Sequence, residues 1–362
     1  MDTSRPIRHK GRGALSAPPG RFEATTTEAV DDGWGSLDEP VTAPETTVGI
    51  DRPRRLIAWN DSPDVPFDRS INPYRGCEHG CVYCFARPSH GYYGLSPGTD
   101  FETRLFRKAD AAERLEDELR HPGYVPATIT LGSNTDPYQP IERDHGVTRS
   151  ILAVLAACRH PVCIITKGSL VERDLDLLAE LAAHSAASVM VSLTSLDGGL
   201  KRALEPRAAG PRRRLRTISR LAAAGVPVGT LIAPVIPALT DAELEALIAA
   251  AAEAGAASAG YVLLRLPHEV EPLFTEWLRV HYPDRAERVL NHLRGAHGGA
   301  CYDAAFGQRM RGNGPYAELL ARRFRVACRK AGIDPDHRIA LSADAFRPPG
   351  RAGDQLGLFG DR

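Results

Sequence analysis

The sequence predicts an α/β fold built around a parallel sheet, and two observations carry that prediction. Short β-rich runs follow one another at intervals of about 30 residues. Longer segments with helical spacing of Leu, Ala, Glu and Arg lie between these runs. This alternation indicates right-handed βαβ units, which place their strands parallel in one sheet.

Six βα units are predicted. The five later strands are Ala127–Leu131, Val162–Thr166, Val189–Thr194, Val228–Ile232 and Tyr261–Leu264. The intervening helices are Thr148–Cys158, Leu170–Ala183, Arg213–Ala224 and Ala242–Ala254, and an earlier unit has a strand near Ile71–Tyr74 and a helix at Ala109–Arg120. Six units suit either a partial barrel or an open doubly wound sheet. In both, the ligand site lies at the carboxyl ends of the strands.

Three further segments flank or follow this core, which we place at residues 51–266. Residues 1–50 are rich in Gly, Pro, Ser, Thr and acidic side chains, and we predict a disordered tail there. Residues 267–346 are predicted to form a helical C-terminal extension, with helices at Pro272–Arg294 and Pro315–Ala331. Residues 347–362, rich in Pro, Gly and Arg, are predicted to be flexible.

Composition excludes several classes of protein. The 45 Lys and Arg residues balance 45 Asp and Glu, which argues against nucleic-acid binding by bulk electrostatics alone but allows a locally basic groove. No run approaches 18 apolar residues and no apolar stretch follows the basic N-terminus, so we expect neither a membrane span nor a secretory signal. We therefore expect a cytoplasmic protein.

The cysteines indicate a metal or cluster site. The chain has seven, an odd number, and three of them lie within eight positions, unlike a disulfide framework. Those three, Cys77, Cys81 and Cys84, are spaced Cys-x3-Cys-x2-Cys in the segment INPYRGCEHGCVYCFARP. Thiolates are the usual ligands of iron–sulfur clusters, and three of them leave one iron of a cubane open to a substrate.

A structural zinc site is the alternative. His79 or His90 would then complete the ligand set, although structural zinc sites more often use paired Cys-x2-Cys knuckles. The other cysteines are scattered, and Cys158 and Cys163 suit small core positions.

The cysteine motif, with Tyr83 before its last cysteine, resembles the signature of the radical S-adenosylmethionine (SAM) superfamily. The segments INPYRGCEHGCVYCFARPSH, GSNTDPYQPIE, ITKGSLVERDLDLL, LEPRAAGPRRRL, GVPVGTLIAPVIPALTD and LLRLPHEV look like its spore photoproduct lyase-like branch, within an uncharacterised bacterial subgroup. The resemblance implies a partial (β/α)6 TIM-like barrel. It also implies a [4Fe–4S] cluster on the three cysteines, with SAM chelating the fourth iron through its amine and carboxylate.

The resemblance further suggests residues that bind SAM. Asn134, Thr135 and Asp136 follow the first long strand, where the superfamily keeps a Gly-Gly-Glu-like turn for the methionyl amine. The Glu of that turn is absent here, and the alternative is a polar turn that caps the strand end.

Four more residues are candidates for SAM binding. Lys167 lies just after a strand, where a cation can meet the SAM carboxylate or remain a solvated loop lysine. Ser192 and Thr194 lie on the next strand, where the superfamily often contacts ribose, and only one of two alternating positions can face the site. Glu205 can accept hydrogen bonds from ribose hydroxyls or pair with Arg207.

Six arginines crowd between residues 207 and 220. Arg213, Arg216 and Arg220 share one helical face. One of the six is a candidate partner of the SAM carboxylate, and we choose Arg216. The other five can line a phosphate-bearing groove. The alternative is a solvated charged face.

The relatives in the lyase branch use an additional cysteine to return a hydrogen atom to the product. Cys301, in the Gly-rich stretch GGACYDAAFG, is our candidate for that donor. Cys301 is chosen for its place in a loop, since no cysteine of the chain aligns with the one in those relatives.

The C-terminal tail carries a short peptide pattern, QLGLF, at residues 355–359. Gln355, Leu356, Leu358 and Phe359 fit the pattern by which bacterial DNA-processing proteins dock on the sliding clamp, with apolar anchors and a Gln amide that fixes register. The alternatives are packing on its own domain and a chance match.

Together these features predict a radical SAM enzyme that cleaves SAM to a 5′-deoxyadenosyl radical and abstracts hydrogen from a DNA base or lesion, as in lyase-like DNA repair. The enzyme needs a one-electron reductant. Two alternatives stay open, namely a radical SAM enzyme acting on a protein, peptide or small metabolite, and a non-catalytic iron–sulfur or zinc protein.

Overall fold

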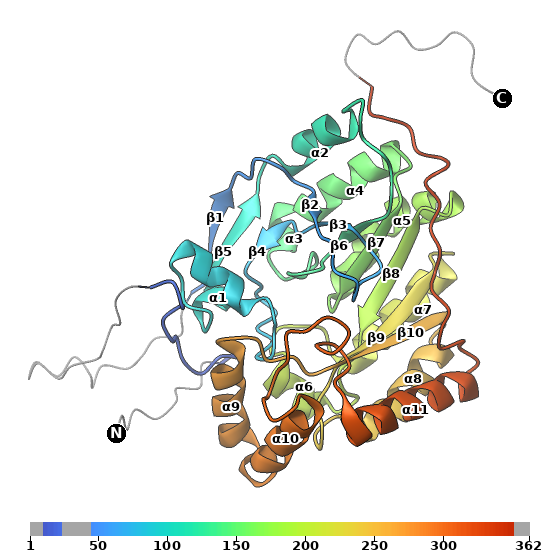
Figure 1. Cartoon of the computed structure of the whole chain (residues 1–362). Helices are drawn as coiled ribbons and strands as arrows, with labels where there is room; N and C mark the ends of the chain where they lie inside the picture. Colours follow the sequence, from blue (N-terminus) through green and yellow to red (C-terminus); the bar gives the residue numbers. More distant parts are fainter. Residues whose placement is uncertain (1–9, 24–44, 351–362) are drawn as a thin grey trace, which may run out of the picture.

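Six parallel strands, arranged in chain order, form the main sheet (Figure 1). The structure is a computed structural model and describes residues 10–23 and 45–350. In spatial order the parallel strands are β10 (Ser258–Leu263), β9 (Val228–Val235), β8 (Ala187–Ser192), β7 (Val162–Thr166), β6 (Ile129–Leu131) and β3 (Arg69–Ile71). The short β2 (Ala58–Trp59) pairs antiparallel with β3 at the edge.

The strand order decides between the two predicted architectures. Because it never reverses, the sheet has no switch point of the kind that defines a doubly wound fold. Within the described residues no strand pairing joins β10 to β2 or β3, so the barrel stays open. The predicted α/β partial barrel is confirmed.

A second sheet of three strands lies beside the barrel, in the order β1 (Thr47–Asp51), β5 (Arg104–Lys108), β4 (Tyr74–Arg75). The sequence predicts one strand near Ile71–Tyr74. In the structure β3 ends at Ile71, and Pro73, which has no backbone N–H to donate, separates it from β4.

Helices follow the strands of the barrel and cover its outer face (Figure 1). In chain order they are α1 (Asp100–Thr103), α2 (Ala111–Leu119), α3 (Glu142–His145), α4 (Val147–Ala157), α5 (Leu175–Ala183), α6 (Gly198–Leu204), α7 (Pro211–Ala223), α8 (Leu244–Glu253), α9 (Val270–His281), α10 (Pro283–Ala296) and α11 (Gly314–Lys330). Short 3-10 helices are η2 (Arg87–Tyr93), η3 (Ser169–Asp174) and η4 (Asp241–Glu243). No helix of the described residues is long and apolar enough to span a membrane.

The C-terminal extension contains three helices rather than the two predicted. The predicted helix Pro272–Arg294 is two helices, because Tyr282 leaves helical geometry (φ −141°, ψ 59°) and Pro283 starts α10. Helices α9 and α10 bury an apolar cluster that also contains Cys81 and Tyr83 of the cysteine loop. The extension therefore packs directly behind that loop.

One buried carboxylate, Glu142 of α3, ties the second sheet to the barrel. It accepts hydrogen bonds from Tyr74 of β4, from the backbone N–H of Thr148 at 2.9 Å, and from Arg173 at 2.5 Å. Burial and the neighbouring Glu142 charge raise the pKa of Tyr74, so the phenol stays protonated and donates.

We predict that Glu142→Gln destabilises the protein by about 1–3 kcal/mol, because the Tyr74 hydroxyl, the Thr148 N–H and Arg173 lose a buried charged acceptor, while Arg173 keeps its pair with Asp174. Urea unfolding measures this loss. Glu287→Gln, at a side chain that is 66% exposed, is the matched control and should change stability little. A Glu142→Gln protein as stable as the control would contradict this role.

Candidate functional site

The cysteine loop lies at the carboxyl end of β3, directly after β4, on the rim where the βα loops meet. Two turns shape it, closed by bonds from the Gly80 N–H to the Cys77 carbonyl (3.3 Å) and from the Cys84 N–H to the Cys81 carbonyl (3.2 Å). Cys77 and Cys81 are buried and Cys84 is half-buried. The loop thus gathers three thiols on one short segment.

Burial governs the acidity of these thiols. It raises the pKa of Cys81 to about 12 and that of Cys84 above its ordinary value. The pKa of Cys77 is raised well above the ordinary value by burial, by the charge of Asp136 and by the other two thiols. Thiols of this kind bind iron by exchanging their protons for the metal. This donor set fits a [4Fe–4S] cluster held by Cys77, Cys81 and Cys84.

The N-terminal segment 10–23, which lies in the predicted disordered tail, packs against the cysteine loop. Glu102 of α1 is fully buried and accepts hydrogen bonds from the Gly13 and Ala14 N–H groups, each at 2.9 Å, and from Arg87. A Cβ at Gly13 would lie 1.9 Å from the Gly80 carbonyl oxygen, so only glycine allows this close approach. We call residues 12–15 the strap.

Asp136 follows β6 and faces the cysteine loop. Its carboxylate accepts from the Thr166 hydroxyl (2.7 Å) and the Lys167 N–H (2.6 Å), and lies 3.3 Å from His79 Nδ1. Burial opposes its ionisation, but His79 and these donors outweigh burial and lower its pKa to about 2. Asp136 is therefore ionised and joins two βα loops to the cysteine loop.

Glu205 follows α6 and is fully buried beneath Tyr83. It accepts from Tyr83, from the Thr194 hydroxyl (2.6 Å) and from Arg214, all on different segments. Burial alone would raise its pKa, but the charges of Arg214 and Lys167 lower it to about 2. The Lys167 ammonium lies 5.9 Å from the Tyr83 ring centroid, so it belongs to the same group.

The predicted arginines differ in burial and in their partners. Arg214 of α7 is buried and also donates to the Ser192 carbonyl (3.0 Å), whereas Arg216, our candidate, is exposed. Arg213 and Arg220 both pair with Glu172, at 2.9 and 2.5 Å.

Several other predicted site residues have definite positions. The Asn134 and Thr135 N–H groups both donate to the Asn72 side chain, at 2.9 and 3.2 Å. Ser192 and Thr194 are buried near the end of β8. Residues 355–359 lie outside the described residues. The roles of these residues in SAM binding stay predictions.

Cys301 is buried in the apolar cluster of α9 and α10 rather than displayed on an open loop. Burial and the nearby Glu271 raise its pKa to about 11. Its neighbour Tyr302 packs against the same cluster, and the Tyr302 hydroxyl accepts from Arg265 at 3.5 Å.

Arg265, which follows β10 at the rim, is not among the site residues predicted from the sequence. Its guanidinium lies 4.8 Å from the Phe85 ring and 6.0 Å from the Tyr302 ring, and its buried Nε has no hydrogen-bond partner among the described residues. Phe85 directly follows Cys84 and is exposed. Two signals in the sequence pointed to Arg265, namely its place after a strand and its place in the family-like segment LLRLPHEV.

Both histidines of the zinc alternative have partners outside the cysteine set. His90 Nε2 lies 2.9 Å from the Arg104 carbonyl oxygen, and His79 faces Asp136. In residues 10–23 and 45–350, no three His, Cys, Asp or Glu side chains are placed to hold a single metal ion.

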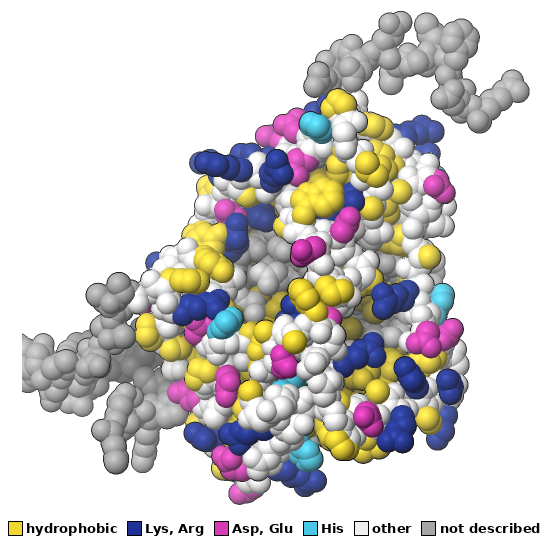
Figure 2. Space-filling view, viewed as in Figure 1, with side chains coloured by type: hydrophobic (Ala, Val, Ile, Leu, Met, Phe, Trp, Pro, Cys, Tyr) yellow, Lys and Arg dark blue, Asp and Glu magenta, His cyan; other side chains and the backbone are white. Residues whose placement is uncertain are grey.

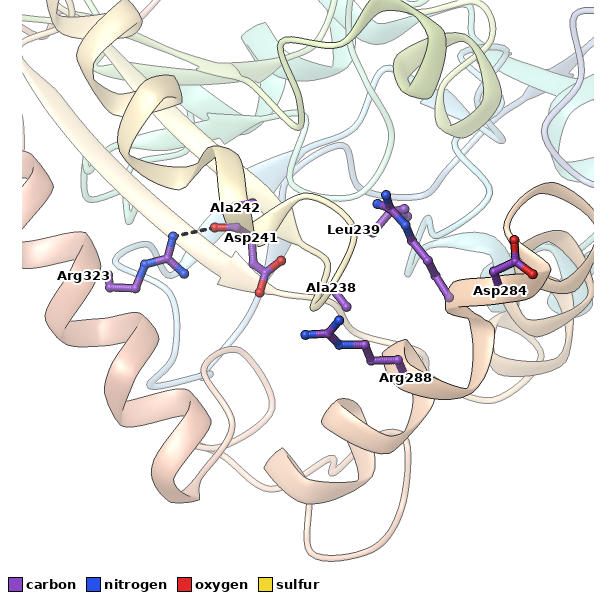
Figure 3. A pocket seen from close by; sticks show the side chains of 8 residues that line it. Ala238, Leu239, Asp241, Ala242, Asp284, Arg288 and Arg323 are labelled. Atoms are coloured by element: carbon purple, nitrogen blue, oxygen red, sulfur yellow. Dashed lines mark hydrogen bonds between the residues drawn. The ribbon is translucent and has the colours of Figure 1, made fainter.

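Two concave features mark this side of the molecule. The surface is hollowed near the centre of the view, between the β1–β5 sheet and β8 (Figures 1 and 2). A separate pocket of about 650 Å³ lies between the β9–α8 loop, α10 and α11, where Arg288 and Arg323 point toward residues 238–242 (Figure 3). None of the predicted site residues lines this second pocket.

Comparison with known proteins places these features in a family. An uncharacterised protein of Mycobacterium tuberculosis is 41% identical over 226 residues, which are 62% of this chain and 66% of the relative. One of Methanocaldococcus jannaschii is 31% identical over 173 residues, 48% of this chain and 62% of the relative. The chain thus matches somewhat less than two thirds of the length of either relative.

Among solved structures, spore photoproduct lyase complexed with dinucleoside spore photoproduct has a TM-score of 0.56 at 15% identity, over 78% of each chain. At that identity the likeness is one of fold. Residues 71–251, from the end of β3 into α8, match the family model described as the radical SAM superfamily, whose members use a [4Fe–4S] cluster and SAM. The chain belongs to the radical SAM superfamily.

Proposed function

We propose that this radical SAM enzyme abstracts a hydrogen atom from a DNA base or lesion in a lyase-like repair reaction. When bound and reduced by one electron, the cluster supplies the electron that splits SAM into methionine and a 5′-deoxyadenosyl radical. The fold likeness to a lyase solved with a dinucleoside photoproduct supports this substrate class. We place the reaction in the cytoplasm, where the seven free cysteines stay reduced.

The observation that carries this proposal is the platform formed by Arg265, Phe85 and Tyr302. The Arg265 guanidinium lies over the Phe85 ring, and a stacked pair of this kind suits a ligand that joins a planar base to a phosphate. No carboxylate of the described residues lies within ion-pair distance of Arg265, and its acidic neighbour Asp64 pairs directly with Arg309 at 2.5 Å, so the Arg265 guanidinium can still contact that phosphate. Because Phe85 adjoins Cys84, a base stacked there lies next to the cluster ligands.

We assign the SAM site to the residues around Tyr83. Glu205 holds the Tyr83 hydroxyl in place, and Lys167 lies beside the ring, where its ammonium can pair with the SAM carboxylate. The Asn134 side-chain amide has no partner among the described residues and is free to bind the methionyl amine. Ser192 and Thr194 remain the candidates for ribose contact.

We predict that Cys77→Ala abolishes both iron binding and formation of 5′-deoxyadenosine, because the cluster loses one of three protein ligands. Iron analysis and chromatography after anaerobic reconstitution and dithionite reduction measure the two quantities. Cys163→Ala, at a half-buried cysteine of β7, is the control and should keep both. Equal iron in the two variants would sink the assignment of the cysteine loop.

We predict that Gly13→Ala destabilises the iron-free protein by about 1–3 kcal/mol and lowers its iron content, because the new Cβ collides with the Gly80 carbonyl oxygen. Gly210→Ala is the matched control, since Gly210 has φ −71° and an added Cβ there meets no atom within 4 Å. Thermal unfolding and iron analysis compare the two. If both variants behave alike, the strap has no part in holding the loop.

We predict that Arg265→Gln weakens binding of a short single-stranded DNA about tenfold or more at low salt, because one charge-assisted contact to phosphate is lost. Fluorescence anisotropy measures the affinity, and SAM cleavage in the absence of DNA should be unchanged. Arg279→Gln, at an arginine of α9 that is 63% exposed, is the control. A wild-type protein that cleaves SAM but binds no DNA would favour the protein, peptide or metabolite alternative.

A further inference from the structure

An exposed aromatic face lies on the segment that leaves the cysteine loop. The 3-10 helix η2 starts three residues after Cys84, and its Tyr92 stacks on Phe22 of the N-terminal segment with ring centroids 4.9 Å apart. Tyr92 is 72% exposed, Phe22 is 54% and Tyr93 is 39% exposed. Phe22 and Tyr92 thus form an exposed stacked pair, and Tyr93, which follows Tyr92 in the chain, stacks on Phe106 at 5.3 Å; exposed aromatic side chains of this kind mark an interaction site. We call Phe22, Tyr92 and Tyr93 the aromatic face.

Ring contacts lead inward from this face to a cysteine. The Tyr93 ring lies 6.5 Å from His90, and His90 packs edge-on against Phe101 at 5.4 Å. Phe101 shares a small buried cluster with Cys77, and its carbonyl accepts the Cys77 N–H at 2.9 Å. The face therefore connects to a cluster ligand through two successive ring contacts.

The rim of the face presents positive charge. Arg75 lies 5.0 Å from the Tyr93 ring centroid and pairs with Asp51, and the arginine side chain is 39% exposed against 13% for the aspartate. Arg104 pairs with Asp100, and their side chains are 57% and 26% exposed. Arg21, beside Phe22, pairs with Glu269, and their side chains are 32% and 13% exposed. In each of these three pairs the arginine is the more exposed partner, so its guanidinium rather than the carboxylate faces an approaching protein. Glu23, the exposed acid next to Phe22, accepts from the Gly20 N–H at 3.0 Å.

We infer that the aromatic face is the docking surface for a small acidic one-electron carrier protein. This inference rests on the proposed function, since reductive SAM cleavage requires one electron from outside. The reduced carrier loses one electron and the cluster gains it, and no covalent bond forms between the two proteins. Aromatic anchors ringed by arginines suit an acidic partner that binds briefly and leaves, because the charges speed encounter while the rings supply contact.

The test compares Phe22→Ala/Tyr92→Ala with wild type, using a recombinant bacterial flavodoxin as the probe. Surface plasmon resonance gives the affinity, and bleaching of the visible absorbance gives the rate of cluster reduction by reduced flavodoxin or by dithionite. We expect the double variant to bind about tenfold more weakly and to be reduced by flavodoxin correspondingly more slowly, with the dithionite rate unchanged. Trp59→Ala, an aromatic that is 57% exposed on β2, is the matched control and should behave as wild type.

Charge is tested separately with Arg104→Glu, which should weaken flavodoxin binding and reduce its dependence on salt. Unchanged affinity in the double variant overturns the docking surface. So does a wild-type protein that holds its cluster and is reduced by dithionite but does not bind flavodoxin, and that outcome leaves the proposed function intact. A protein that takes up no iron would overturn both.

Discussion

Three buried carboxylates hold the cysteine loop, and each reaches it from a different part of the chain. Glu102 of α1 fixes Arg87 and the strap, Asp136 after β6 faces His79, and Glu205 after α6 binds Tyr83. A buried charge is costly unless hydrogen bonds and counter-charges surround it, and each of the three has at least three donors or cations about it. The loop is therefore held by bonds to the rest of the protein as well as by its cysteines, which is what a cluster with one open iron requires of its protein ligands.

Much of the barrel could be read from the sequence because its strands are apolar on both faces. Runs such as Val162–Thr166 stand out because one face of each strand packs under the outer helices and the other lines the barrel, and the observed bounds follow the predicted ones closely. The second sheet could not be read, because Thr47 pairs with Arg104 across more than fifty residues and the strands are short. The break between α9 and α10 could not be read either, because it depends on Tyr282 alone leaving helical geometry. Pro283, the next residue, does not reveal the break, since proline also suits the first turn of a helix.

The cysteines of the site were predictable because their spacing alone brings them together, whereas the supporting residues depend on tertiary packing. Arg213, Arg216 and Arg220 share a helical face, but the face of α7 that turns toward β8 carries Arg214. Which arginine enters the site beside Glu205 depends on how α7 packs on the sheet. Cys301 illustrates the same limit, because a Gly-rich stretch suggests an open loop while α9 and α10 bury the thiol.

The segment that follows Cys84 has to be rigid because it carries two surfaces. Phe85 joins Arg265 and Tyr302 at the rim, and two residues later Arg87 begins the 3-10 helix that carries the aromatic face. A substrate at the first and an electron carrier at the second would both act on a segment of a few residues. If that segment moved with either partner, binding one would displace the ligands that serve the other. The buried Arg87–Glu102 pair lies between these two surfaces in the chain and anchors the segment from within, so that each partner meets a loop whose position the other does not change.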